Sequence, residues 1–209
     1  VYRRSEKHYL HDSNRNISII DGKYDADDRK DAEEIHPLYV LMKKSYGSSM
    51  MDIDGHWEHT SGVSSYTNLI TVYDWYNNNL GWQSFNGKGK KIRCLVDVEF
   101  KTDNACYEPF FEFFIAGPAN EFLYPPCAQL DVMAHEYTHG VFEKITGGFD
   151  KVTVMNTAIS EGYADIFGCL IEGNWLLAES LSEYPLRDPT GHSFMLFDNT
   201  KYPSKYEGE

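Results

Sequence analysis

The chain has 209 residues, of which 42% are hydrophobic and 15% aromatic, a composition typical of globular proteins and not of disordered ones. Its formal net charge of −13 argues against nucleic acid as a partner, because a phosphate backbone requires a basic surface. No apolar run approaches the roughly 20 residues of a membrane span, so we expect no association with a membrane.

The predicted elements of the first part of the chain, up to about residue 125, are mainly strands and turns. Residues 16–20 form an apolar strand that ends at an Asp-Gly turn. Residues 25–35 are densely charged and predict a solvated loop or a short exposed helix. Apolar residues recur at helical spacing over 63–80, and residues 92–98 alternate like a half-buried strand.

The second part of the chain is predicted to be helical. Apolar residues recur every three or four positions from Leu130 to Ile145, and two glycines at 147–148 end this helix. A second helix is expected over about 157–172. Cys169 lies in this helix and is expected to be a buried free thiol. The other three cysteines could form disulfides if the protein is exported, but the sequence does not indicate which of them would pair.

His135 and His139 lie four residues apart on the first of these helices, so their side chains share one face. Two imidazoles placed in this way can hold one zinc ion at about 2.0–2.1 Å each. Glu136 can sit beside the metal without binding it, which is the place of a general base for a zinc-activated water. A chance match of the motif is the alternative, and only its sequence context can decide between the two.

The context supports a zinc site. The second helix offers Glu161 and Asp165, again four residues apart on one face. Glu161 can complete a His₂Glu site with an open fourth position, and Asp165 can accept the outer N–H of a ligand histidine. The longer histidine-rich zinc motif would need a glycine and a histidine at the positions of Phe142 and Ile145, so it is excluded.

Two segments closely resemble the thermolysin family of neutral metalloproteases: residues 131–140, DVMAHEYTHG, and residues 160–168, SEGYADIFG. The first string is also typical of fungalysins, a related secreted family. The likeness extends over most of the chain, at 8–24, 71–76, 185–189 and 202–206. It implies an α+β fold in three parts: a β-rich N-terminal domain (1–128), an active-site helix (129–147) and the start of a helical C-terminal domain (148–209).

The resemblance further implies a secreted, extracellular zinc endopeptidase that cuts peptide bonds before apolar residues. His135, His139 and Glu161 would hold the zinc ion, and Glu136 would take the proton of the activated water and pass it to the leaving amine. Extended substrate would pair with an edge strand. The residues implied in substrate binding are Asn104, Ala105, Tyr107, Val132, Leu186 and Arg187. For Val132 and Leu186, plain core packing is the alternative.

Structural calcium is also implied by the resemblance. Its ligands would be Asp131, Glu172, Asn174, Glu179, Asp52 and Asp54. Leu176 and Ser180 stand where further ligands are expected, which favours one ion over the double site of the family. Asp52 and Asp54 would form a separate looped site, for which a solvated acidic turn is the alternative.

Two family residues have no counterpart in the sequence. One is a histidine that stabilises the tetrahedral intermediate, expected just beyond Glu209, and the other is a tyrosine expected near Gly148. We therefore expect a missing C-terminal segment or a second chain to complete the active site. Two alternatives remain open: a catalytically impaired fragment that binds peptides and is stabilised by zinc and calcium, or a purely structural zinc site. Glu136 argues against both, because metal binding alone does not need it.

Overall fold

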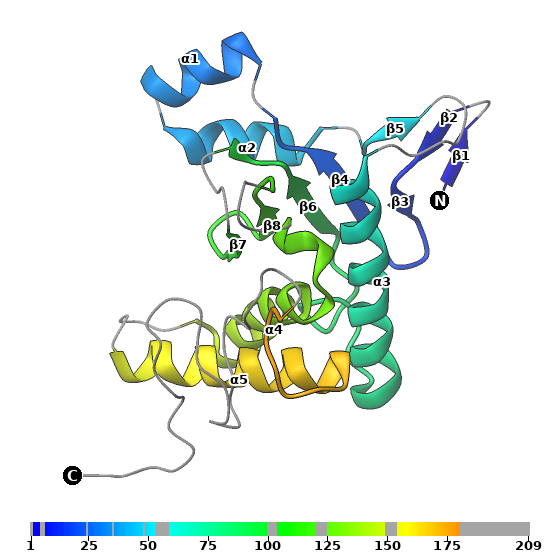
Figure 1. Ribbon diagram of the computed structural model, residues 1–209, viewed down its shortest axis with the longest axis vertical. Coiled ribbons are helices and arrows are strands. Elements are labelled where there is room, and N and C mark those ends of the chain that lie inside the picture. The colour runs from blue at the N-terminus through cyan, green and yellow to red at the C-terminus, as the bar shows by residue number, and fades with distance from the viewer. Residues whose placement is uncertain are drawn as a thin grey trace.

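The computed structural model of the protein describes residues 2–4, 7–23, 25–34, 36–47, 49–52, 59–99, 104–119, 125–148 and 154–179. The strands are β1 (Tyr2–Arg4), β2 (Lys7–Tyr9), β3 (His11–Asp12), β4 (Ile17–Asp21), β5 (Met51–Asp52), β6 (Ile92–Val96), β7 (Ala105–Glu108) and β8 (Phe113–Ala116). The helices are α1 (Ala26–Glu34), α2 (Pro37–Ser45), α3 (Thr60–Leu80), the short 3₁₀ helix η2 (Pro126–Ala128), α4 (Leu130–Thr146) and α5 (Val154–Glu172). Figure 1 shows the sheet and α1–α2 above, the α4–α5 pair below, and α3 running alongside both.

The larger sheet has five strands in the order β3-β4-β6-β8-β7. β4, β6 and β8 are parallel to one another, whereas β3 and β7 add antiparallel edges. Most residues of β4, β6 and β8 are buried, as expected for parallel strands covered on both faces. β1, β2 and β5 form a separate three-stranded sheet.

Helices cover both faces of the larger sheet. On one face, Leu69 and Val72 of α3 belong to a core cluster that includes Ile19 of β4 and residues of α4. On the other face, Leu41 of α2 packs with Leu95 of β6 in a second cluster. Burial of these side chains, each contributing about 1.5–3 kcal/mol, holds the two helices on the sheet.

The helix α4 is central to the arrangement, because it packs against α3, β7 and, most extensively, α5. Aromatic rings join these helices: Tyr76 of α3 lies 5.3 Å from Tyr137 of α4 and 5.6 Å from Phe167 of α5, measured between ring centroids. The helix α4 ends at Thr146 and is capped by Gly147, whose left-handed φ of 74° suits a glycine C-cap. Because α4 packs against both α5 and β7, its histidines lie between α5 and the β7 edge of the sheet.

Several sequence predictions are confirmed. β4, β6, α3 and α4 lie where strands and helices were expected, α1 forms within the charged segment 25–35, and Cys169 is a buried free thiol. The other three cysteines form no disulfide in the described part of the chain either. The expectation of mainly strands and turns before residue 125 was too narrow, because α2 was not predicted at all. The division of the chain into three domains stays a prediction.

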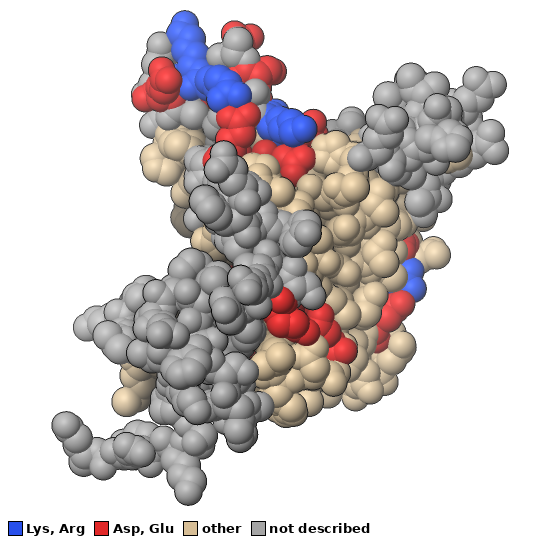
Figure 2. Space-filling view, in the orientation of Figure 1, with Lys and Arg blue, Asp and Glu red and all other residues tan. Residues whose placement is uncertain are grey.

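The surface over α1 and α2 carries charges of both signs. Figure 2 shows Lys and Arg beside Asp and Glu there, and ion pairs join Lys44 to Asp28 (2.6 Å) and Arg29 to Glu99 (2.6 Å). Among the helices that the structure describes, none has the length and apolar character needed to cross a membrane.

Candidate active site

Three side chains converge where α4 meets α5. The Nε2 atoms of His135 and His139 lie 3.0 Å apart. The carboxylate of Glu161 faces both, with Oε2 3.4 Å from Nε2 of His135 and Oε1 3.5 Å from Nε2 of His139. In a tetrahedral site with bonds of about 2.0–2.1 Å, neighbouring ligand atoms lie about 3.3 Å apart. The donor set and its spacing therefore fit a zinc ion.

The outer ring atoms of both histidines are also engaged. Nδ1 of His135 lies 2.9 Å from Oδ1 of the buried Asp165, and Nδ1 of His139 lies 2.9 Å from Oγ of Ser160. A carboxylate can only accept, so Asp165 favours the tautomer of His135 in which Nδ1 carries the proton and Nε2 offers its lone pair inward. Ser160 can accept from His139 in the same tautomer.

The charge balance of this cluster is negative. Burial disfavours the charged form of His135, but Asp165, Glu161 and Glu136 together outweigh burial and raise its pKa to about 9. The three carboxylates thus stabilise a positive charge at the centre of the cluster. A divalent cation at the same place would satisfy them and would let the histidines stay neutral ligands.

Glu136 stands beside the donor triad without belonging to it. Its Oε1 is 4.0 Å from Nε2 of His135, and its Oε2 accepts a 2.9 Å hydrogen bond from the backbone N–H of Tyr107 on β7. The side chain is buried, so this bond fixes where the carboxylate points. Gly140 permits the close approach of α4 to β7, because a Cβ there would lie 3.3 Å from both Phe85 and Tyr107.

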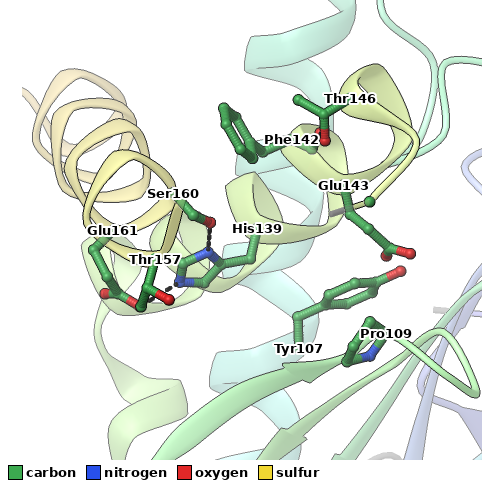
Figure 3. A pocket seen from close by; sticks show the side chains of 10 residues that line it. Tyr107, Pro109, His139, Phe142, Glu143, Thr146, Thr157, Ser160 and Glu161 are labelled. Carbon is green, nitrogen blue, oxygen red and sulfur yellow. Dashed lines mark hydrogen bonds and ion pairs between the residues drawn. The ribbon is translucent and has the colours of Figure 1, made fainter. Parts of the chain in front are cut away.

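A cavity of about 430 Å³ extends from this cluster between α4, α5 and the β7–β8 hairpin. Figure 3 shows His139 and Glu161 at one end of it, Glu143 and Tyr107 pointing toward each other, and Phe142 and Thr146 on the α4 side. The walls are mostly apolar or hydroxyl-bearing, and the cavity is open to solvent. Its size is that of a pocket for a small group bound beside His135, His139 and Glu161.

A second acidic cluster lies at the start of α4 and the end of α5. Carboxylate oxygens of Asp131, Glu172 and Glu179 lie within 4.8 Å of one another. Burial raises the pKa of Asp131 to about 6, with Glu179 adding to the effect. Burial, together with Asp131 and Glu179, raises that of Glu172 to about 7. Crowded oxygens of this kind fit calcium.

Asn174 lies between two carboxylates of this cluster, and its role as a calcium ligand stays a prediction. Its Nδ2 donates to Glu172 (3.1 Å) and Glu179 (2.7 Å), while its Oδ1 accepts from the backbone N–H of Leu176. The amide thus holds the two carboxylates together by hydrogen bonds.

The other residues predicted to bind substrate or calcium are placed as follows. Asn104 is exposed just before β7, and Ala105 and Tyr107 are buried on that strand. Val132 lies in the main hydrophobic core cluster. Asp52 ends β5, but its side chain is not among those described. Asp54, Leu186 and Arg187 lie outside the described residues.

Two contacts of the cluster were not foreseen from sequence. The first is the hydrogen bond between Ser160 and His139, which no sequence pattern indicates, because a serine in a helix more often bonds its own backbone. The second is the hydrogen bond from the N–H of Tyr107 to Glu136. It depends on which strand lies next to α4, and no local sequence pattern encodes this.

Comparison with known proteins adds to this geometry. A family model described as thermolysin metallopeptidase, catalytic domain, matches residues 1–143. Bacillolysin of Brevibacillus brevis is 28% identical over 173 residues, which cover 78% of this chain and 31% of the relative. Neutral protease B of Bacillus subtilis is 26% identical over 185 residues, which cover 87% of this chain and 32% of the relative. The chain thus spans about a third of the length of these curated relatives.

Among solved structures, the precursor of protealysin, a metalloproteinase from Serratia proteamaculans, superposes with a TM-score of 0.62 at 17% identity. The match covers 89% of this chain and 54% of that one. At this level of identity the likeness concerns the fold, which is the α+β arrangement that the sequence predicted.

Proposed function

The chain belongs to the thermolysin metallopeptidase family, and from this premise we propose that it provides the zinc centre and general base of a secreted metalloendopeptidase. One observation carries the proposal: His135, His139 and Glu161 converge at zinc-ligand spacing, with the carboxylate of Glu136 beside them. A structural zinc site would not need an unligated carboxylate held in place by a backbone N–H.

In this proposal some residues bind the zinc ion and others orient its ligands. When bound, zinc supplies a Lewis acid that activates water and polarises the scissile carbonyl. His135, His139 and Glu161 hold the ion, while Asp165 and Ser160 orient the two imidazoles.

Glu136 carries the proton transfer in this proposal. It takes a proton from the attacking water and delivers it to the leaving amine, and the Tyr107 N–H keeps its Oε2 from turning away. Substrate lies extended along β7 at Asn104 and Ala105, and the adjoining cavity takes its side chains. Leu186 and Arg187 are proposed to contribute to the substrate pocket, with cleavage before apolar residues.

The test compares the full-length wild-type protein with its Glu136→Gln variant on an internally quenched peptide that has an apolar residue after the scissile bond. We expect the variant to lose at least about 100-fold in turnover, because general-base catalysis contributes about 10²–10⁴-fold. Zinc content, measured by metal analysis, should stay at one ion per chain. The matched control is Glu33→Gln, which changes an exposed glutamate of α1 and should leave both quantities unchanged.

The outcomes separate the alternatives. Turnover that survives in Glu136→Gln would exclude this residue as the base. A wild-type chain that holds zinc and binds the peptide without cleaving it would instead favour the peptide-binding module.

A further inference from the structure

The position of β7 determines the geometry of the general base. β7 pairs with β8 on one side, in the register Ala105↔Ala116 to Glu108↔Phe113, and it is the last strand of the sheet order. Its outer side carries the Tyr107 N–H that bonds Glu136. Because no further strand of the described sheet lies on that side, side chains must hold β7 at the correct distance from α4.

An ion-pair network at the tip of the β7–β8 hairpin provides such a link. Nζ of Lys144, in the last turn of α4, lies 2.6 Å from Oε1 of Glu112 and 3.3 Å from Oε1 of Glu143. Lys90 contacts the other oxygen of Glu112. The side chains of Glu112 and Lys144 are only 21% and 24% exposed, so solvent and salt screen the pair less than a surface pair.

The same helical turn also holds the ring of Tyr107. Figure 3 shows the carboxylate of Glu143 directed at the Tyr107 hydroxyl. Burial, together with this carboxylate, raises the pKa of Tyr107 well above its usual value, which is consistent with close contact. Lys144 is thus linked to the hairpin tip through Glu112, and it also contacts Glu143, whose carboxylate faces the ring of Tyr107.

We propose that Lys144 is a positioning residue for the reaction. By tying Glu112 and Glu143 together, it sets the distance between β7 and α4, and with it the 2.9 Å hydrogen bond from Tyr107 to Glu136. The lysine lies eight residues, or about 12 Å of helix, beyond Glu136, so it has no contact with the metal cluster. This inference rests on the proposed function, in which Glu136 is the base.

The kinetic test uses the full-length, zinc-loaded protein and three variants: Lys144→Met, Glu112→Gln and the double variant. We expect kcat to fall about tenfold in Lys144→Met, since small misplacement of a catalytic group costs up to about 10²-fold. The fall should exceed any change in KM, Lys144→Arg should restore most of it, and the double variant should be no worse than the single ones. Lys88→Met, at an exposed lysine of a neighbouring turn, is the control and should be neutral.

A second readout does not depend on activity. Amide hydrogen exchange at residues 105–116 should be at least about fivefold faster in Lys144→Met than in wild type, while exchange in α3 and zinc content stay the same. Unchanged exchange at Tyr107 together with unchanged kcat would overturn the proposal. If the full-length wild-type protein cleaves no peptide, the proposed function fails, and the exchange rates still decide whether Lys144 holds β7.

Discussion

At the scale of single residues, the outer ring nitrogens of the two proposed zinc-binding histidines have chemically different partners. His135 faces the buried carboxylate of Asp165, whereas His139 faces the neutral hydroxyl of Ser160. A carboxylate raises the basicity of a ligand imidazole more than a hydroxyl does. Asp165 is therefore expected to contribute more to metal affinity than Ser160, although neither touches the ion.

The corresponding prediction concerns zinc affinity. Asp165→Asn should weaken zinc binding by about 10–100-fold, within the range known for outer ligand partners, and Ser160→Ala should weaken it less. Competition with a chelator of known affinity measures both. Equal losses in the two variants would contradict the unequal support inferred here.

A second residue-scale feature is the carboxylate of Asp12. Arg15 bridges it (2.6 Å) to Asp74 of α3 (2.7 Å) and so fastens the β3–β4 turn to that helix. Burial alone would raise the pKa of Asp12, but its hydrogen bonds to the Arg15 side chain and to the N–H groups of Arg15 and Asn14 lower it below the usual value. The carboxylate thus stabilises the fold above the unfolded pKa of about 3.9, and this contribution is lost as pH falls through the lower native pKa.

We therefore expect Asp12→Asn to reduce the free energy of unfolding by about 1–3 kcal/mol at about pH 7. The difference from wild type should shrink as the pH falls through the lowered native pKa of Asp12, below which the wild-type carboxyl is protonated too. Urea unfolding over a series of pH values measures this difference. Asp27→Asn, at an exposed acid of α1, should show no such dependence.

At the scale of elements, the crossing of α4 and α5 depends on a glycine. A Cβ at Gly168 would lie 3.0 Å from the backbone O of Asp131 and 3.1 Å from Cδ1 of Leu177. Backbone cannot yield as a flexible side chain does. A side chain at residue 168 would therefore require α5 to shift away from the start of α4 by a few tenths of an ångström.

Two alanine substitutions in α5 test this packing. Gly168→Ala should destabilise the protein by about 1–3 kcal/mol through overpacking. Gly162→Ala, where an added Cβ meets nothing within 4 Å, should be neutral or stabilising by about 0.5–1 kcal/mol, because alanine favours the helix. Thermal unfolding of the two variants measures the difference, and similar Tm values would show that the crossing tolerates a methyl group.

The elements also show what sequence could and could not predict. α3 and α4 were predicted because each presents a long apolar stripe, and the pairs His135/His139 and Glu161/Asp165 share helical faces by spacing alone. The nine-residue helix α2 escaped prediction because its apolar run 38–42 has no clear period. The contact between Tyr107 and Glu136 follows from the strand order, with β7 outside β8, which depends on long-range pairing.

At the scale of the whole molecule, the acidic cluster joins the start of α4 to the segment after α5. Because burial raises the pKa of Asp131 to about 6 and that of Glu172 to about 7, the metal-free fold loses stability as these groups ionise with rising pH. A calcium ion would offset that cost, and it would do so only where the carboxylates are charged.

We expect calcium to raise Tm strongly at about pH 8 and little at about pH 5, with zinc kept saturating throughout. An ion present at about 100 times its Kd would add about 2.7 kcal/mol. Thermal unfolding with and without calcium measures the gain, and Asp131→Asn should abolish it. A gain of the same size at both pH values would argue against this cluster as the binding site.

The cysteine thiols, none of which forms a disulfide among the described residues, can report how the molecule opens. Burial raises the pKa of the Cys94 and Cys127 thiols, so an alkylating reagent can modify them only after the core between α3 and the sheet has come apart. Cys106 is half-buried on β7, next to Tyr107. The rate of its alkylation, compared with that of Cys94, would therefore distinguish the detachment of one edge strand from the unfolding of the whole chain.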